Sequence, residues 1–376
     1  MPRYKFEDIA FNITDKRMPL PEDKELYIGL EHLDTGCLWV TRCGSPVDIK
    51  GQKLVMRKGD LLFGRRNTYL RRAAIAPHDG LFSAHGMIFR PKTDVITAEF
   101  FPYFISSNYF MEAAIRISVG SLSPTVNWKQ LKELEFDIPE IEDQSKYAEL
   151  FSAIDRSREA YKALITKTDE LVKSQFIEMF GDPFINERGW KVSEFSKLCT
   201  AIGDGLHGTP VYDDEGPYPF INGNNLRENK IEITPETRRV GQEMYDKHFI
   251  DLDNTTVMLS INGTLGKTAL YNGETVILGK SACYSKVGPL LDREFVLAVF
   301  LSDAFQQYMQ DNSTGTTIKN FGLKALRTYP MIVPPIEEQR KYVQFMRQSD
   351  KSKFEAKQAI QTLDSLYLNI EKKCFS

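Results

Sequence analysis

The chain has 376 residues, of which 42% are hydrophobic and 26% charged, so it can form two or three globular domains with sizeable cores. Its formal net charge of −3 excludes a surface that is basic all over, and any nucleic-acid contact must come from a local patch. Five cysteines without metal spacing, a start without a signal-peptide core and no apolar run of 18 residues favour a reduced, cytoplasmic compartment without a membrane span.

Residues 1–137 are predicted to form a first α+β domain. Short apolar runs between Gly, Pro and Asn residues predict strands over 26–30, 37–40, 60–64 and 86–91. Aromatic residues at helical spacing predict one helix over 97–115, with the aromatic stripe in the core.

A basic patch lies inside this first domain. Between Arg42 and Arg72 there are nine basic residues and two acidic ones, a local net charge of +7. Arginine suits bidentate contact with guanine edges or phosphates, asparagine can contact adenine, and hydroxyl groups reach backbone oxygens. The patch therefore predicts DNA contacts, with a solvated charged face as the alternative. The candidate residues are Lys58, Arg65, Arg66, Asn67, Thr68, Tyr69, Arg71 and Arg72.

A long helix is predicted within residues 138–183. Pro139 and a cluster of acidic residues suit a helix N-terminus, and Gly181 followed by Pro183 suits its end. Apolar residues recur at about three positions in seven, as in a helix that packs lengthwise on another. At 1.5 Å per residue this helix would be roughly 55–60 Å long and could act as a spacer.

The second half of the chain repeats the first. Residues 184–335 resemble the first domain in texture, and residues 336–376 predict a second long helix. The segment 138–147, IPEIEDQSKY, returns as VPPIEEQRKY at 333–342, and the offset of 195 residues holds without a gap from Gly120/Gly315 to Leu171/Leu366. We interpret this as an internal duplication.

Three further loops are candidates for DNA contact. The loop equivalent to the basic patch, Ser260–Lys267, is rich in Asn, Thr and Gly. The segments 118–127 and 313–321 are matched hydroxyl-rich loops that could hold phosphates, or could simply close back onto the long helix. The candidates here are Ser121, Ser123, Asn262, Thr264, Lys267, Thr316, Thr317 and Lys319.

The two long helices are expected to pair as an antiparallel coiled coil with pseudo-twofold symmetry, because each has an apolar stripe of the same length. Separate packing of each helix on its own domain is the alternative. The residues expected in the spacer helices or at their partner surfaces are Tyr147, Leu150, Ile154, Leu164, Leu171, Tyr342, Phe345, Leu363 and Leu366.

Signatures of catalysis are weak. The segment 263–268 ends like a phosphate-binding loop, but position 261 is Ile where a glycine is required. Residues 182–184 lack the second proline of an adenine-methyltransferase tetrapeptide, and 228–230 has nuclease-like spacing without a matching strand context. His207 and His248 have no evident partner for a metal site or a catalytic triad. We expect no catalytic residue and no metal site.

The tandem of domain, long helix, domain, long helix resembles the specificity (S) subunit of type I restriction–modification systems. The resemblance covers the whole chain and rests on GSLSPTVN (120–127), GTTIKNF (315–321), the helix entries IPEIEDQ and VPPIEEQ, and MFGDPFINERGW (179–190). One departure is that the basic loop of the first half lacks the GTLGK-like core of the second.

The resemblance implies that 1–137 and 184–335 are target-recognition domains, each for one half of a bipartite DNA target, and that the helices are spacers that dock methyltransferase subunits. It implies partners, namely double-stranded DNA, two methyltransferase subunits, and restriction subunits. It also implies that S-adenosylmethionine, ATP and Mg²⁺ are bound by those partners and not by this chain. A stand-alone tandem DNA-binding protein is the alternative, and a methyltransferase or nuclease is a further one.

Overall fold

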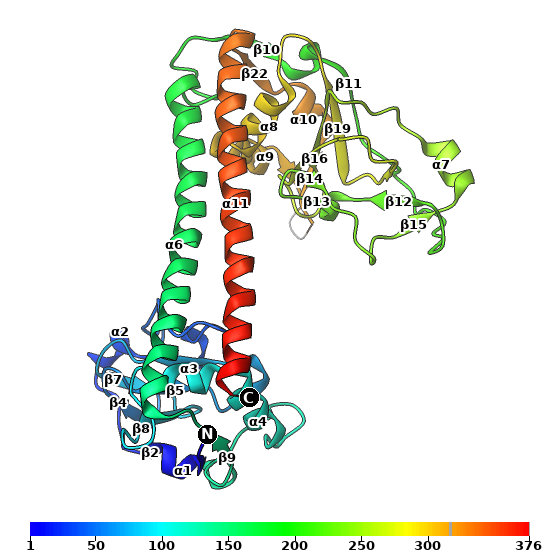
Figure 1. Ribbon diagram of the computed structural model, residues 1–376. Helices are drawn as coiled ribbons and strands as arrows, with labels where there is room; N and C mark the ends of the chain where they lie inside the picture. The colour runs from blue at the N-terminus through cyan, green and yellow to red at the C-terminus, as the bar shows by residue number, and fades with distance from the viewer. Residues whose placement is uncertain (316–317, 376) are drawn as a thin grey trace. The chain divides into compact units, whose positions relative to one another are not determined.

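The computed structural model describes residues 1–315 and 318–375 and divides into two compact units. Unit 1 consists of Met1–Lys162 with Lys357–Ser376, and unit 2 is Ala163–Ala356. Each unit contains a globular α+β part and a portion of each of two long helices, α6 (Ile141–Phe180) and α11 (Ile336–Cys374) (Figure 1). The expected mixed class with two long helices is confirmed.

A four-stranded antiparallel sheet with strand order β2-β8-β5-β6 is the centre of unit 1. A smaller antiparallel sheet has the order β3-β4-β7, and β1 pairs with β9. The strands are β1 Arg3–Lys5, β2 Ala10–Ile13, β3 Lys16–Arg17, β4 Lys53–Met56, β5 Leu61–Phe63, β6 Ala73–Ile75, β7 Gly80–Phe82, β8 Met87–Pro91 and β9 Glu135–Asp137. The helices before α6 are α1 Phe6–Ile9, α2 Asp23–Leu26, α3 Phe101–Ser106, α4 Asn108–Arg116 and α5 Trp128–Leu131.

Unit 2 repeats the central sheet, with four antiparallel strands in the order β11-β19-β16-β17, whereas its smaller sheet is mixed because β12 and β18 are parallel. Its smaller sheet has the order β15-β12-β18, and β10 pairs with β22 as β1 does with β9. The strands are β10 Lys191–Glu194, β11 Cys199–Gly203, β12 Tyr218–Ile221, β13 Leu226–Arg227, β14 Lys230–Ile231, β15 Arg239–Val240, β16 Thr256–Ser260, β17 Thr268–Leu270, β18 Ile277–Leu278, β19 Ala282–Val287, β20 Ser313–Thr314, β21 Asn320–Phe321 and β22 Pro330–Val333. The helices are α7 Gln242–His248, α8 Arg293–Leu301, α9 Asp303–Asp311 and α10 Leu323–Arg327.

Three elements predicted for the first domain were wrong in detail. The helix predicted over 97–115 is two helices, because the Ser107 backbone is extended and its hydroxyl accepts a hydrogen bond from Phe110 N at 3.1 Å, which caps α4. The strands predicted over 26–30 and 37–40 are single bridges at Ile28 and Trp39, because these segments meet the sheet at one residue only. Ser302 breaks α8 from α9 in the same way.

The long helices run antiparallel in both units. In unit 1, Phe151 of α6 contacts Tyr367 of α11, with ring centroids 4.7 Å apart, and in unit 2 Phe176 of α6 contacts Tyr342 of α11 at 5.4 Å. Residue numbers on α6 therefore rise as those on α11 fall. The expected pairing of the two helices is confirmed (Figure 1).

A buried glutamine fastens the first turn of each long helix to its unit. Gln144 donates to the carbonyl oxygens of Val95 at 3.0 Å and Pro139 at 2.8 Å, and accepts a hydrogen bond from Thr97 N at 2.7 Å. Gln339 makes the same three bonds in unit 2, at residues that lie 195 positions later in each case. The duplication therefore extends back to residue 95, beyond the start of the ungapped sequence match.

Candidate nucleic-acid interface

In unit 1 the basic loop and a hydroxyl-rich loop are hydrogen-bonded to each other. The arginine loop (64–72) connects β5 to β6, and the serine loop (118–127) follows α4. Val126 N donates to Arg65 O at 3.0 Å, and Asn67 N donates to Pro124 O at 2.8 Å. Two segments that are more than 45 residues apart in sequence thus form one composite surface.

Unit 2 has the same pair of loops. The glycine loop (260–267) connects β16 to β17, and the threonine loop (313–321) follows α9. Phe321 N donates to Ile261 O at 2.8 Å, and Gly263 N donates to Lys319 O at 3.0 Å. Thr316 and Thr317 lie outside the described residues.

The arginine loop and the glycine loop close in the same way. Gly64 N donates to Arg72 O at 2.9 Å, and Ser260 N donates to Lys267 O at 2.8 Å. Arg72 and Lys267 therefore occupy equivalent positions at the loop exits, although the arginine loop is one residue longer. A cation is retained at this position in both units.

Left-handed residues stand at equivalent points in the two loops. Asn67 has φ 54° where Gly263 has φ 77°, and Arg71 has φ 48° where Gly266 has φ 82°. Glycine adopts this conformation freely and asparagine tolerates it, whereas arginine is strained in it. The arginine loop therefore differs from the GTLGK-like core of the glycine loop in its side chains, but both loops have the same left-handed residues and the same backbone hydrogen bond between their ends.

Three buried polar atoms of the arginine loop have no hydrogen-bond partner. They are Arg65 Nε, Asn67 Oδ1 and Arg72 Nε, which make up most of the five such side-chain atoms in the described part of the chain. Buried polar groups in proteins are nearly always paired, so this concentration points to water or a bound ligand at the loop.

The outward face of the paired loops in unit 1 is both cationic and apolar. Arg66 and Ser121 are exposed, and Tyr69 and Leu122 are 56% and 95% exposed. Lys58 is also exposed but precedes β5, so it lies at the opposite end of that strand from the arginine loop.

In unit 2 the equivalent face carries less charge. Thr264 and Lys319 are exposed, while Asn262 and Lys267 are partly buried. Asn262 Nδ2 donates to Asn320 Oδ1 at 3.1 Å, and Lys319 donates to Gln310. The two faces share a backbone arrangement and present different chemical groups.

Two of the predicted DNA-contacting side chains are occupied inside unit 1. Thr68 is buried, and its hydroxyl donates to Arg65 O at 2.8 Å. Arg72 donates to Leu30 O at 3.0 Å and Arg66 O at 3.2 Å, and burial lowers the pKa of its guanidinium. These contacts stabilise the loop, so Thr68 is not available to a ligand in this conformation.

Arg71 connects the arginine loop to the end of α11. Its guanidinium donates to Asn108 Oδ1 and forms an ion pair with Glu112 at 3.6 Å. Asn108 in turn donates through its backbone N to Glu371 at 2.5 Å and through Nδ2 at 3.2 Å. Burial raises the pKa of the Glu371 carboxyl. Arg71 therefore has a positioning role that its sequence context did not indicate.

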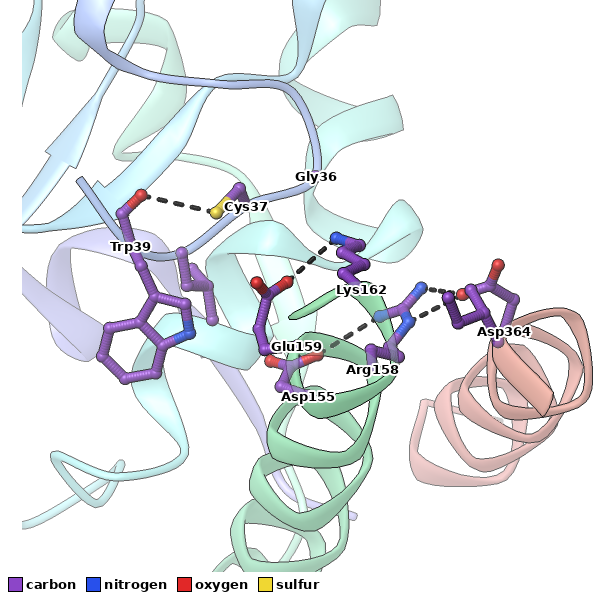
Figure 2. A pocket seen from close by; sticks show the side chains of 10 residues that line it. Gly36, Cys37, Trp39, Asp155, Arg158, Glu159, Lys162 and Asp364 are labelled. Atoms are coloured by element: carbon purple, nitrogen blue, oxygen red, sulfur yellow. Dashed lines mark hydrogen bonds and ion pairs between the residues drawn. The ribbon is translucent and has the colours of Figure 1, made fainter. Parts of the chain in front are cut away.

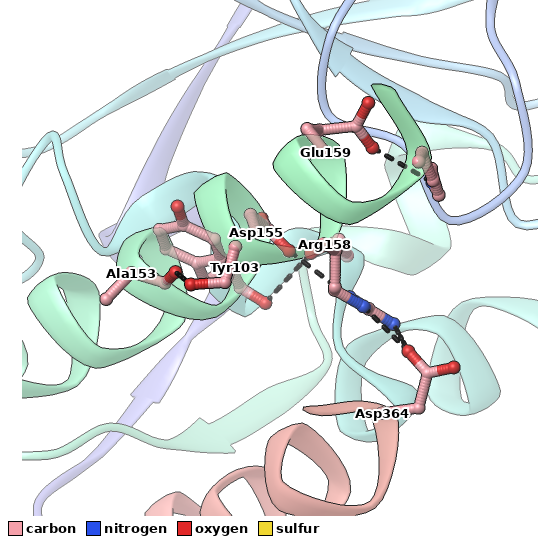
Figure 3. Close-up of polar contacts among 9 residues, drawn as sticks. Tyr103, Ala153, Asp155, Arg158, Glu159 and Asp364 are labelled. Carbon is pink, nitrogen blue, oxygen red and sulfur yellow. Dashed lines mark hydrogen bonds and ion pairs between the residues drawn. The ribbon is translucent and has the colours of Figure 1, made fainter. Parts of the chain in front are cut away.

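A cation bridges the two long helices at the same place in each unit. In unit 1 Arg158 of α6 bonds Asp155 at 3.2 Å and Asp364 of α11 (Figures 2 and 3). In unit 2 Lys353 of α11 bonds Asp350 at 2.8 Å and Asp169 of α6 at 2.7 Å. Each residue of the unit 1 bridge has its counterpart 195 positions away in unit 2. The cation is arginine in one unit and lysine in the other, so the identical residues of the duplication did not reveal the whole motif.

The predicted helix-stripe residues fall into two groups. Ile154 and Tyr342 are buried, and Tyr147, Phe345 and Leu363 are partly buried. The remaining leucines, each about half exposed, are Leu150, Leu164, Leu171 and Leu366. A two-helix seam covers a narrower face than three residues in seven, so part of each stripe stays at the surface.

The weak catalytic signatures have structural explanations. Asp182 Oδ1 accepts hydrogen bonds from Phe184 N at 2.7 Å and Ile185 N at 3.1 Å, so it caps the turn after α6. Glu228 and Asn229 are left-handed residues of the β13–β14 turn. Within 1–315 and 318–375, no group of three His, Cys, Asp or Glu residues could hold a metal ion, and no helix is long and apolar enough to cross a membrane.

The repeated fold and its paired loops define a protein of two tandem α+β domains, and comparison with known families identifies its class. The model of the type I restriction modification DNA specificity domain matches residues 45–167 and 187–363. The chain belongs to this family of DNA specificity subunits.

Relatives with this architecture are distant in sequence. A Methanocaldococcus jannaschii protein, described as the specificity subunit of the type I restriction enzyme MjaX, is 21% identical over 342 residues, covering 83% of this chain and 77% of the relative. A chain from a structural study of the assembly and conformational transition of a type I R-M system has a TM-score of 0.62 at 18% identity, with 100% of this chain and 97% of that one covered. The S subunit from M. genitalium has a TM-score of 0.59 at 14% identity, with 100% and 96% covered.

Proposed function

We propose that this chain is a non-catalytic subunit that recognises an asymmetric, bipartite DNA target. Residues 1–137 would bind one half of the target through the arginine and serine loops, and residues 184–335 the other half through the glycine and threonine loops. The observation that carries the proposal is the repeated loop pair, which has a common backbone and different outward side chains. Two DNA-contacting surfaces that share a backbone arrangement but carry different side chains suit a target with two different halves.

The side chains proposed to contact DNA differ in their roles. Arg66, Tyr69 and Ser121 are outward on the paired loops of unit 1, and Arg66 can make bidentate contacts with guanine or phosphate. Arg65 and Asn67 have unpaired buried polar atoms that a ligand or water would satisfy. Arg71 and Arg72 would support the loop from inside.

We further propose that α6 and α11 dock two methyltransferase subunits and that restriction subunits join the complex. The half-exposed leucines of both helices support this, because aliphatic side chains on a paired helix surface suit a further helix. Adenine methylation with S-adenosylmethionine, and cleavage with ATP and Mg²⁺, would then belong to the partners, and this chain would bind none of these cofactors.

Domain exchange tests the two-reader proposal. Residues 1–137 are replaced by the corresponding segment of a homologous specificity subunit, and the chimera is expressed with its methyltransferase. Methylome sequencing is expected to show a change in one half of the target and the same second half. A change in both halves would contradict two independent readers, and methyl transfer by the purified chain alone would overturn the non-catalytic assignment.

A further inference from the structure

Unit 2 contains a hollow of about 670 Å³ between the two long helices and the α8–α9 pair. The apolar part of its wall includes Val172, Phe176, Ala298, Tyr342 and Met346. The hollow in the corresponding place in unit 1 has about 330 Å³, and its wall includes the charged residues Asp155, Arg158, Asp364 and Glu371. Equivalent elements thus enclose spaces that differ twofold in volume.

Aromatic side chains fill this space in unit 1. Tyr103 of α3 is buried and stacks on Phe151 of α6, with ring centroids 5.2 Å apart. Phe151 also contacts Tyr367 of α11 at 4.7 Å. The three rings form a continuous column between the domain and the helix pair.

Each member of that column is smaller in unit 2. With the offset of 195 residues, Ala298 stands for Tyr103, Met346 for Phe151 and Val172 for Tyr367. The same offset relates the hydrogen bonds of Gln144 to those of Gln339 and the cap at Ser107 to the cap at Ser302, so the backbones correspond. Ala304, which also lines the hollow, stands for Tyr109.

A further difference concerns one residue that lines each hollow, Leu38 in unit 1 and Asn229 in unit 2. In unit 1 Leu38 is buried against the core, and its carbonyl oxygen accepts a hydrogen bond from Ile75 N at 2.9 Å. In unit 2 Leu270 N donates in the same way to Asn229 O at 3.0 Å, so Asn229 occupies the place of Leu38. Asn229 lines the hollow, but its side chain accepts a hydrogen bond from Thr268 at 2.8 Å. A buried leucine that lines the hollow of unit 1 is therefore replaced by a polar residue in unit 2.

The charges around the hollow define what could enter it. Four aspartates and two lysines line it, an excess of two negative charges. Lys353 is held by two of these aspartates, and Lys173 lies 3.4 Å from Asp303. Protein interiors are close-packed, and an apolar hollow of this size with an acidic rim suits a large hydrophobic side chain on a segment that also carries basic residues.

We propose that the hollow of unit 2 is a socket for an aromatic or branched aliphatic side chain of the methyltransferase subunit. This rests on the proposed function, in which the helices that wall the hollow dock that subunit. The methyltransferase side chain fills the apolar space that Tyr103, Tyr367 and Leu38 fill in unit 1. The two ends of the helix pair therefore bind their partners differently, and the socket is present in unit 2.

Refilling the hollow tests the socket. Ala298→Tyr restores the residue found at the duplicated position, and Thr200→Tyr, at an exposed site on β11, is the matched control. The full chain is titrated calorimetrically with the purified methyltransferase subunit. Ala298→Tyr is expected to weaken binding at least about 10-fold, since it removes the space for a buried anchor residue, and the control to bind as the unchanged chain does. Equal affinity of both variants, in a folded chain, would overturn the socket.

Photocrosslinking gives a second test that does not depend on filling the hollow. The photoreactive residue p-benzoylphenylalanine is placed at Leu301, on the rim of the hollow, and at the duplicated position, Ser106, as the control. A crosslink to the methyltransferase from position 301 and none from 106 is expected, at a hydrophobic residue near basic ones. A crosslink to a second copy of this chain, or none from 301, would overturn the assignment. If the unchanged chain does not bind the methyltransferase at all, the proposed assembly and the socket both fail, whereas DNA binding by the chain is measured separately.

Discussion

Replacement of Gln144 by leucine probes how each long helix is fastened to its unit. Gln144 is fully buried and satisfies three backbone groups, namely the carbonyl oxygens of Val95 and Pro139 and the N–H of Thr97. Leucine fits the volume and satisfies none of them. An unsatisfied buried polar group costs about 1–3 kcal/mol, so the loss for three groups, reduced by relaxation, is about 3–5 kcal/mol.

Urea unfolding followed by circular dichroism measures this loss, and hydrogen exchange locates it. The Thr97 amide is expected to lose protection in Gln144→Leu, because it donates its hydrogen bond to the Gln144 side chain. Gln339→Leu is expected to do the same to the Asp292 amide in unit 2. Glu149→Leu, at an exposed position on the same helix, is the control. A loss below about 1 kcal/mol in Gln144→Leu, with Thr97 still protected, would refute the reasoning.

Three further predictions concern charge. Arg66→Ala is expected to weaken DNA binding about 10-fold. If Arg66 contacts a phosphate, the slope of log K against log salt concentration also becomes shallower by about 1, which titrations at several salt concentrations check. An unchanged affinity would leave Arg66 as a solvated surface charge. Lys286 lies 2.7 Å from the Asp253 carboxylate and lowers its pKa from 3.8 to about 2. The ion pair therefore adds to the free energy of unfolding above pH 3.8, and this stabilisation is lost as the pH falls through 2. Asp253→Asn is therefore expected to cost about 1 kcal/mol at pH 7, allowing for solvent screening, and progressively less towards pH 2 in thermal melts, and a pH-independent cost would contradict this. Lys353→Met is expected to cost about 1–2 kcal/mol in urea unfolding, because it leaves two aspartates facing each other across the helix pair, and Lys353→Arg is expected to restore most of the loss.

The sequence by itself determined the frame of this protein. The two long helices, their entries at Pro139 and Pro334, and the order of domain and helix follow from local signals, because helical periodicity and end signals act within a few residues. The internal duplication supported these predictions, because each helix start and each apolar stripe occurs twice in the sequence. The helix predicted over 97–115 shows the limit, because one capping serine divides an otherwise helical pattern.

Only the tertiary structure decided which residues meet. The arginine loop and the serine loop are joined by backbone hydrogen bonds that carry no side-chain signature, so the sequence could name both loops without pairing them. The burial of Thr68 and the bond from Arg71 to Asn108 depend on elements far along the chain. The hollow of unit 2 depends on five substitutions on separate elements, which become one feature when the fold brings Ala298, Val172 and Asn229 to the same wall. Local propensity specifies elements, whereas the contents of a shared space are set by long-range packing.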